Sequence, residues 1–108
     1  MGQHSKAGTP TGHLSHTQSF HYIDLGVNGV SIGEFGQLAM CASELMVRTI
    51  FCSGDEALGR EARALVPGIE TVAVKRGLRK GTGEDLDHAS YGRFYTGAIH
   101  LHPEKARR

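Results

Sequence analysis

The sequence has little excess charge of either sign and no long apolar run. Its 108 residues include twelve lysines and arginines against eleven aspartates and glutamates, which gives a net charge near +1. That balance provides no strong positive field to attract nucleic acid or an anionic membrane surface. No stretch approaches the roughly 18 apolar residues that a membrane-spanning helix needs. We therefore expect no nucleic-acid partner and no membrane partner.

Cysteine is also scarce, and two cysteines do not make a disulfide framework. Cys41 and Cys52 lie in apolar segments, so we expect buried thiols in a reduced, cytoplasmic setting. The first residues lack the apolar core of a secretory signal. The chain contains no internal repeat, and its length suits one small domain with a modest core.

The N-terminal third predicts a loop followed by a hairpin. Residues 1–18 are rich in Gly, Ser, Thr and His and have no hydrophobic periodicity, as is typical of irregular segments. Asn28-Gly29 then separates two strand-like runs, residues 20–25 and 30–32. An Asn-Gly pair favours a type I′ turn, whose two central residues both need positive φ. We therefore expect a β-hairpin within residues 19–33.

The middle of the chain predicts alternating helices and strands. Apolar residues recur at three- and four-residue steps across residues 34–46, which indicates an amphipathic helix. Residues 47–52 and 71–74 are apolar, strand-like runs on either side of a second helix at 55–66. Ser53 and Glu56 have the form of a capping box, whereas Asp55 could cap the helix itself. This helix-strand-helix-strand order over 34–75 predicts an α/β fold with some parallel pairing.

The C-terminal part, residues 76–108, predicts a charged, glycine-rich loop and one terminal helix. The helix is indicated by the spacing of its apolar and aromatic residues from Tyr91 to Ile99, although two glycines weaken it. His100 and His102 lie at its expected end, where histidines commonly contact exposed carbonyls.

Three residues form a candidate metal site: His4, His16 and Glu34. Neutral imidazole nitrogen and carboxylate oxygen are both good donors for zinc. The spacing matches no short zinc signature, so scattered surface histidines remain an alternative. Glu34 also opens the predicted helix, where a carboxylate interacts favourably with the helix dipole. Residues alone do not decide between these roles.

Several motifs occur in order along the chain. They are Gly-x-His-x-Lys-Ala-Gly-Thr-Pro at 2–10, Leu-Ser-His at 14–16, Asn-Gly-x-x-x-Gly-Glu-Phe-Gly at 28–36, Cys-Ser-Gly-Asp at 52–55 and Leu-Val-Pro-Gly-Ile-Glu-Thr-Val-Ala-Val-Lys at 65–75. Together they resemble the D-aminopeptidase family of di-zinc metallopeptidases, closely over residues 2–78 and loosely beyond.

The resemblance implies a function for each candidate. His4 and Glu34 would bind zinc, and His16 would be the catalytic residue beside the two Zn²⁺ ions of the complete enzyme. The substrate would be a short peptide with a free N-terminus, with a preference for D-amino acids at that end. Family members are also ring-shaped, so a homo-oligomer is expected. No family role falls on His13 or His21.

The departure from the family concerns length. Members are more than twice as long, and their first ligands lie in an Asp-x-Glu motif followed by a further histidine, none of which precedes His4 here. We interpret residues 1–108 as the C-terminal portion of such a domain, with residues 1–18 as its active-site loop and an incomplete sheet. Alone, this portion is expected to be inactive. The alternatives are a non-catalytic remnant and a stand-alone small α/β binding module.

Overall fold

A four-stranded sheet carries the fold in the computed structural model, which describes residues 2–108. Its strands are β1 (Gly2–Gln3), β4 (Phe51–Asp55), β5 (Glu70–Gly77) and β6 (Ala98–His100), in the order β1-β4-β5-β6. The pairs β1–β4 and β4–β5 are parallel, and β5–β6 is antiparallel. The α/β class and the parallel pairing are as predicted from the sequence.

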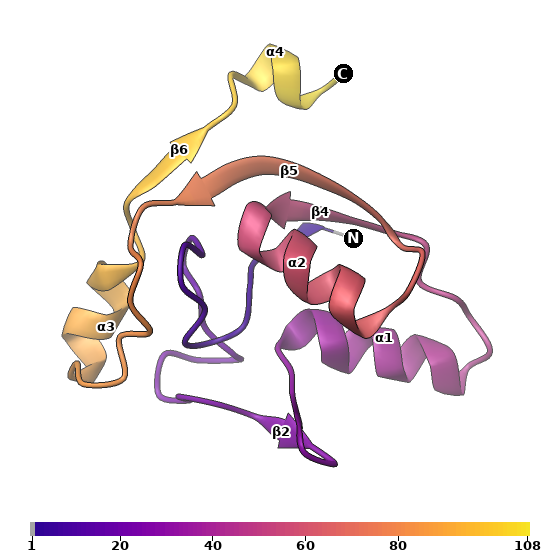
Figure 1. Ribbon diagram of the computed structural model, residues 1–108, viewed down its shortest axis with the longest axis horizontal. Coiled ribbons are helices and arrows are strands. Elements are labelled where there is room, and N and C mark those ends of the chain that lie inside the picture. Colours follow the sequence, from indigo (N-terminus) through magenta and orange to yellow (C-terminus); the bar gives the residue numbers. More distant parts are fainter. Residues whose placement is uncertain (1) are drawn as a thin grey trace.

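Two helices pack together at one face of this sheet. They are α1 (Glu34–Glu44) and α2 (Glu56–Leu65), and of the two it is α2 that packs on the strands β4 and β5. Figure 1 shows α2 lying across β4 and β5 with α1 beside it. The buried core between these elements consists of Phe35, Cys52, Leu58, Ala62 and Ile69. Phe51 and Val72, whose side chains point to the opposite face of the sheet, are 43% and 46% exposed. The domain is accordingly flat, with extents of 39 × 39 × 17 Å.

The predicted Asn-Gly hairpin forms, but it is short. Strands β2 (Gly26–Val27) and β3 (Val30–Ser31) pair across Asn28 and Gly29, whose φ angles are 50° and 79°. Residues 20–25, predicted as a strand, are not one. Phe20 instead turns its ring towards His16, with centroids 4.8 Å apart, and towards Tyr91 at 6.1 Å. Tertiary aromatic packing therefore overrides the local strand preference.

Other predicted boundaries also move. The first helix ends at Glu44 rather than at residue 46, because the backbone of Met46 is left-handed, with φ of 59°. The strand predicted at 47–52 lies instead at Phe51–Asp55, and the one at 71–74 lengthens to Glu70–Gly77. Cys41, predicted as buried, is exposed, whereas Cys52 is buried. The cap of α2 is Asp55, whose carboxylate accepts from the Leu58 amide, so the capping box does not form.

The C-terminal part contains more than a loop and one helix. It has α3 (His88–Phe94), then strand β6, then the short helix α4 (Pro103–Ala106). Ala98 and Ile99 were predicted to continue a helix but pair with Gly77 and Arg76 of β5. Similarly, Gly2 and Gln3 were predicted as loop but pair with Ser53 and Gly54. Both corrections have one cause: two- and three-residue strands depend on partners distant in sequence and have no local periodicity.

None of the helices in the described chain is long and apolar enough to cross a membrane.

Candidate metal centre

The parallel sheet brings His4 to the edge where the strands of the sheet end. Gln3 of β1 lies opposite Gly54 of β4, so His4 and Asp55 leave the sheet side by side at its carboxyl edge. In open α/β sheets this edge is where ligands usually bind. Figure 1 shows the loop after β1 running below this edge before it returns towards α1.

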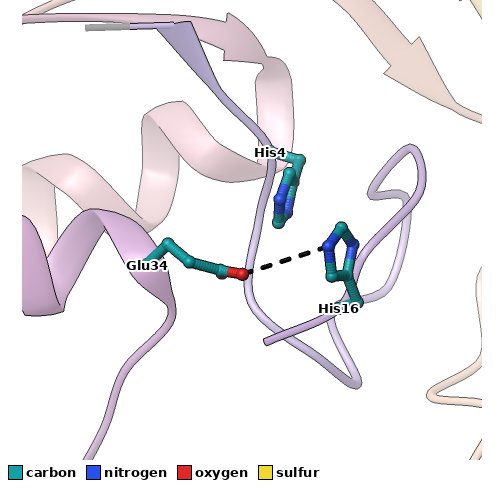
Figure 2. A group of neighbouring side chains, drawn as sticks. All are labelled: His4, His16 and Glu34. Carbon is teal, nitrogen blue, oxygen red and sulfur yellow. Dashed lines mark ion pairs between the residues drawn. The ribbon is translucent and has the colours of Figure 1, made fainter. Parts of the chain in front are cut away.

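His4, His16 and Glu34 form one cluster. Each offers a donor atom, and these atoms all lie within 4.8 Å of one another. Figure 2 shows His4 following β1, His16 on the loop and Glu34 at the start of α1, with their side chains converging. All three residues are partly buried. The structure thus brings together the three residues singled out in the sequence.

Both histidines have one ring nitrogen occupied and the other available. The Nδ1 of His4 lies 3.0 Å from the Ser5 carbonyl oxygen, and the Nδ1 of His16 lies 2.7 Å from that of Leu14. A carbonyl only accepts, so in the neutral form of each ring the proton lies on Nδ1 and the lone pair on Nε2. Metal-binding histidines typically donate their second nitrogen to a carbonyl or carboxylate in this way. The two rings also stack, with centroids 4.0 Å apart.

Glu34 has one carboxylate oxygen engaged and one without a partner. Its Oε1 accepts from the Gln18 amide at 2.5 Å and lies 3.9 Å from the Nε2 of His16. Its Oε2 is buried and has no hydrogen-bond partner. A buried carboxylate oxygen without a donor is unfavourable unless something else satisfies it.

The cluster therefore fits a small cation with nitrogen and oxygen ligands. Two free imidazole nitrogens and an unsatisfied carboxylate oxygen are the donors that Zn²⁺ prefers. Ligands of a tetrahedral zinc lie about 3.3 Å apart, so donors within 4.8 Å need only side-chain adjustment to reach that spacing.

Asp55 fixes the loop that carries the histidines. The aspartate is 1% exposed, and its carboxylate accepts from the Leu58 amide at 2.6 Å, from the His13 amide at 2.8 Å and from the Ser5 hydroxyl at 3.4 Å. The Ser5 hydroxyl in turn bonds to that of Ser15 at 2.7 Å. The sequence favoured a capping role for Asp55, which is confirmed, but it gave no sign of the bonds to the loop.

Gly12 and Gly77 let this loop approach the sheet. A Cβ at Gly12 would collide with the hydroxyls of Ser5 and Ser15, and a Cβ at Gly77 would collide with the Gly12 carbonyl. Hydrogen bonds join the same segments: the Gly77 amide donates to the Thr11 carbonyl at 2.9 Å. The loop is therefore clamped between Asp55 and β5.

Glu61 of α2 links the backbone near His4 to the backbone near Glu34. Its carboxylate accepts from the amide of Lys6, two residues after His4, at 2.9 Å. It also accepts from the amide of Gly33, the residue before Glu34, at 3.2 Å. Burial raises the pKa of Glu61, and the two amide hydrogen bonds counteract that rise. The sequence analysis missed Glu61, because its partners are backbone groups that no motif reveals.

Helix α3 supports the loop from the other side. The Gly8 amide donates to the Tyr91 hydroxyl at 2.8 Å, and the Tyr91 ring packs edge-on against Tyr95, with centroids 5.3 Å apart. Tyr95 is fully buried, and its hydroxyl donates to the Thr82 carbonyl at 2.7 Å. Burial, followed by the neighbouring Tyr91, raises the pKa of Tyr95.

The remaining histidines lie outside the cluster. His13 packs against His100, whereas His21 stacks on His88. His100, expected at a helix end, lies in β6, and His102 caps α4. A hollow of about 750 Å³ lies between α1, the hairpin and the end of α2. Its lining is mainly apolar and includes no residue of the cluster.

These features define an α/β protein with a candidate metal centre of two imidazoles and a carboxylate. The sequence profile of the D-aminopeptidase family matches residues 1–105, and the chain belongs to that family. A D-aminopeptidase of Bacillus subtilis (strain 168) is 32% identical over 96 residues, which cover 89% of this chain and 35% of that protein.

The fold is also similar to that of a solved structure from this family. The Zn-dependent D-aminopeptidase DppA from Bacillus subtilis, described as a self-compartmentalizing protease, matches with a TM-score of 0.64 and 30% identity. The match covers 89% of this chain and 35% of that chain. The family resemblance is therefore confirmed, and the chain spans about a third of the length of these relatives.

Proposed function

We propose that this chain supplies part of the active site of a zinc-dependent aminopeptidase that releases N-terminal D-amino acids from short peptides. The observation that supports this most is the cluster of His4, His16 and Glu34, with two free imidazole nitrogens and an unsatisfied carboxylate oxygen. Zinc dependence and D-aminopeptidase activity are properties named for its relatives.

His4 and Glu34 are the proposed metal ligands. His4 presents Nε2 with its ring held by the Ser5 carbonyl, and Glu34 presents Oε2 while the Gln18 amide holds Oε1. Zinc bound here would polarise the scissile carbonyl and lower the pKa of a water molecule. In the complete enzyme we expect two Zn²⁺ ions, with the further ligands contributed from outside this chain.

His16 is the proposed catalytic residue. The Leu14 carbonyl holds the proton on its Nδ1, so its Nε2 is free to accept a proton and later return it to the leaving amine. Stacking on His4 and packing against Phe20 restrict the orientation of the ring.

We also propose that the complete protein assembles into a homo-oligomer. The end of α1 and the segment after it expose large apolar side chains: Leu45 is 76% exposed, Met46 94%, Val47 58% and Ile50 68%. Contiguous exposed apolar patches commonly mark interaction surfaces. The description of the Bacillus subtilis relative as self-compartmentalizing agrees with this proposal.

A segment exchange tests the proposed activity. The part of the Bacillus subtilis D-aminopeptidase that aligns with this chain is replaced by residues 1–108, and hydrolysis of D-alanyl-p-nitroanilide is measured with zinc. We expect turnover in the exchanged protein and none from the 108-residue chain alone. His16→Ala should abolish turnover while zinc remains bound, whereas Glu34→Ala should lose both.

His102→Ala is the matched control, because His102 caps α4 outside the cluster. It should leave both turnover and zinc content unchanged. Equal zinc loss in His16→Ala and Glu34→Ala would refute the division of roles. An exchanged protein that folds and binds zinc but hydrolyses nothing would refute the proposed function.

A further inference from the structure

A pocket of about 420 Å³ opens beside the cluster. His4 and His16 of the cluster contribute to its lining, and so do two basic residues outside the cluster, His13 and Lys75, which we call the basic wall. Pockets of this size accommodate small ligands. His4 and His16 belong to the proposed catalytic site, but the basic wall has no role in it.

Lys75, the cation of the basic wall, is half-buried on β5 and has no ion-pair partner among the described residues. The nearest strand neighbour that could neutralise it is Asp55, opposite Lys75 across β4 and β5. The Asp55 oxygens, however, already accept from the amides of Leu58 and His13. The ammonium group therefore remains available to an anion.

Two histidines adjoin this lysine. His100 lies opposite Lys75 in the β5–β6 register, and its ring meets that of His13 edge-on, with centroids 5.2 Å apart. The Nδ1 of His13 is buried and has no hydrogen-bond partner. Burial lowers the pKa of His13, and the nearby charges of Lys75 and His100 lower it further. The wall thus combines a cation with a polar atom that lacks a partner.

The sheet gives the separation of the backbones that carry His4 and Lys75. His4 follows β1 and Lys75 lies on β5, with β4 between them, so their backbones are two strand spacings, or about 10 Å, apart. An extended peptide advances about 3.3–3.6 Å per residue. Two to three residues therefore span the pocket from the cluster to Lys75.

We infer that this basic wall binds the C-terminal carboxylate of the peptide substrate, with Lys75 as the anchoring cation and His13 beside it. The inference rests on the proposed function, which places the N-terminal end of the same peptide at the cluster. It predicts that a free carboxylate at the C-terminus of a short peptide strengthens binding. A longer peptide or an amide loses the contact with Lys75.

Binding to the metal-free protein tests this without turnover. D-alanyl-D-alanine and its C-terminal amide are titrated separately into the 108-residue chain with chelator present, and backbone amide shifts are followed by NMR. We expect the free acid to bind about tenfold more tightly than the amide, as for one charge-assisted hydrogen bond. The largest shifts should fall at His13, Val74 and Lys75.

Three variants identify the group responsible. Lys75→Met should remove the tenfold difference between acid and amide, and Lys75→Arg should retain it, which separates loss of charge from loss of folding. Lys80→Met is the matched control, because Lys80 is an exposed lysine just after β5 and outside the pocket. It should behave as the unmodified chain does.

Equal affinities for acid and amide, no binding of either, or a difference that persists in Lys75→Met would each overturn the inference. The outcome is separable from that of the segment exchange. An acid preference that depends on Lys75, in a chain whose exchanged protein hydrolyses nothing, would keep the carboxylate pocket and refute the peptidase. Turnover in the exchanged protein, together with equal affinities of the chain for acid and amide, would keep the peptidase and refute the carboxylate pocket.

Discussion

Replacing Asp55 by alanine should destabilise the protein more than the loss of a helix cap alone. The side chain is buried, caps α2 through the Leu58 amide and also accepts from the His13 amide. Removal of an aspartate cap costs about 1 kcal/mol. A partly buried amide left without an acceptor costs about 1–3 kcal/mol more. We therefore expect a loss of about 2–4 kcal/mol, which lowers Tm by roughly 10–20 °C in a domain of this size.

Thermal unfolding followed by far-UV circular dichroism measures this loss. Asp55→Asn keeps one acceptor oxygen and should fall between the wild type and Asp55→Ala. Asp87→Ala is the matched control, since Asp87 caps α3 by accepting from the Ser90 amide at 2.8 Å but lies at the surface. If Asp55→Ala lowers Tm no more than Asp87→Ala does, Asp55 is only a cap and does not hold the loop.

Three further predictions concern other parts of the structure. Glu61→Gln leaves one oxygen for two backbone amides and should raise the zinc Kd about tenfold by calorimetry; a Kd within about twofold of wild type would contradict its positioning role. Because the pKa of Tyr95 is raised in the folded state, its neutral form is favoured there, and the free energy of unfolding should fall as pH rises above about 10. Urea unfolding should show this fall in the wild type and a weaker one in Tyr95→Phe. The double variant Leu45→Ser, Met46→Ser removes exposed apolar surface and should reduce self-association in analytical ultracentrifugation, so unchanged association would exclude this patch as the interface.

Local sequence patterns predicted the elements that depend on local interactions. The apolar spacing located α1 to within two residues, and Asn28-Gly29 located the hairpin turn. The same patterns failed where partners are distant in sequence. Strand β6 forms because β5 offers it a free edge, and residues 20–25 stay irregular because Phe20 packs against Tyr91.

The candidate site divides in the same way. His4, His16 and Glu34 were found from donor chemistry and ordered motifs, and the structure places them together. The contacts that position them were not found, because Glu61 and, beyond its predicted cap, Asp55 bind backbone amides of remote segments. Carboxylates with such partners look like ordinary helix residues in a sequence.

The central claim is that His4 and Glu34 hold zinc, and zinc affinity of the 108-residue chain tests it most directly. Isothermal titration with Zn²⁺ should give a Kd at least about tenfold weaker in His4→Ala and in Glu34→Ala than in the wild type. His102→Ala should bind zinc as the wild type does, because His102 lies outside the cluster. Zinc binding that is unchanged in His4→Ala and Glu34→Ala, or that is lost in His102→Ala, would contradict the proposed metal centre.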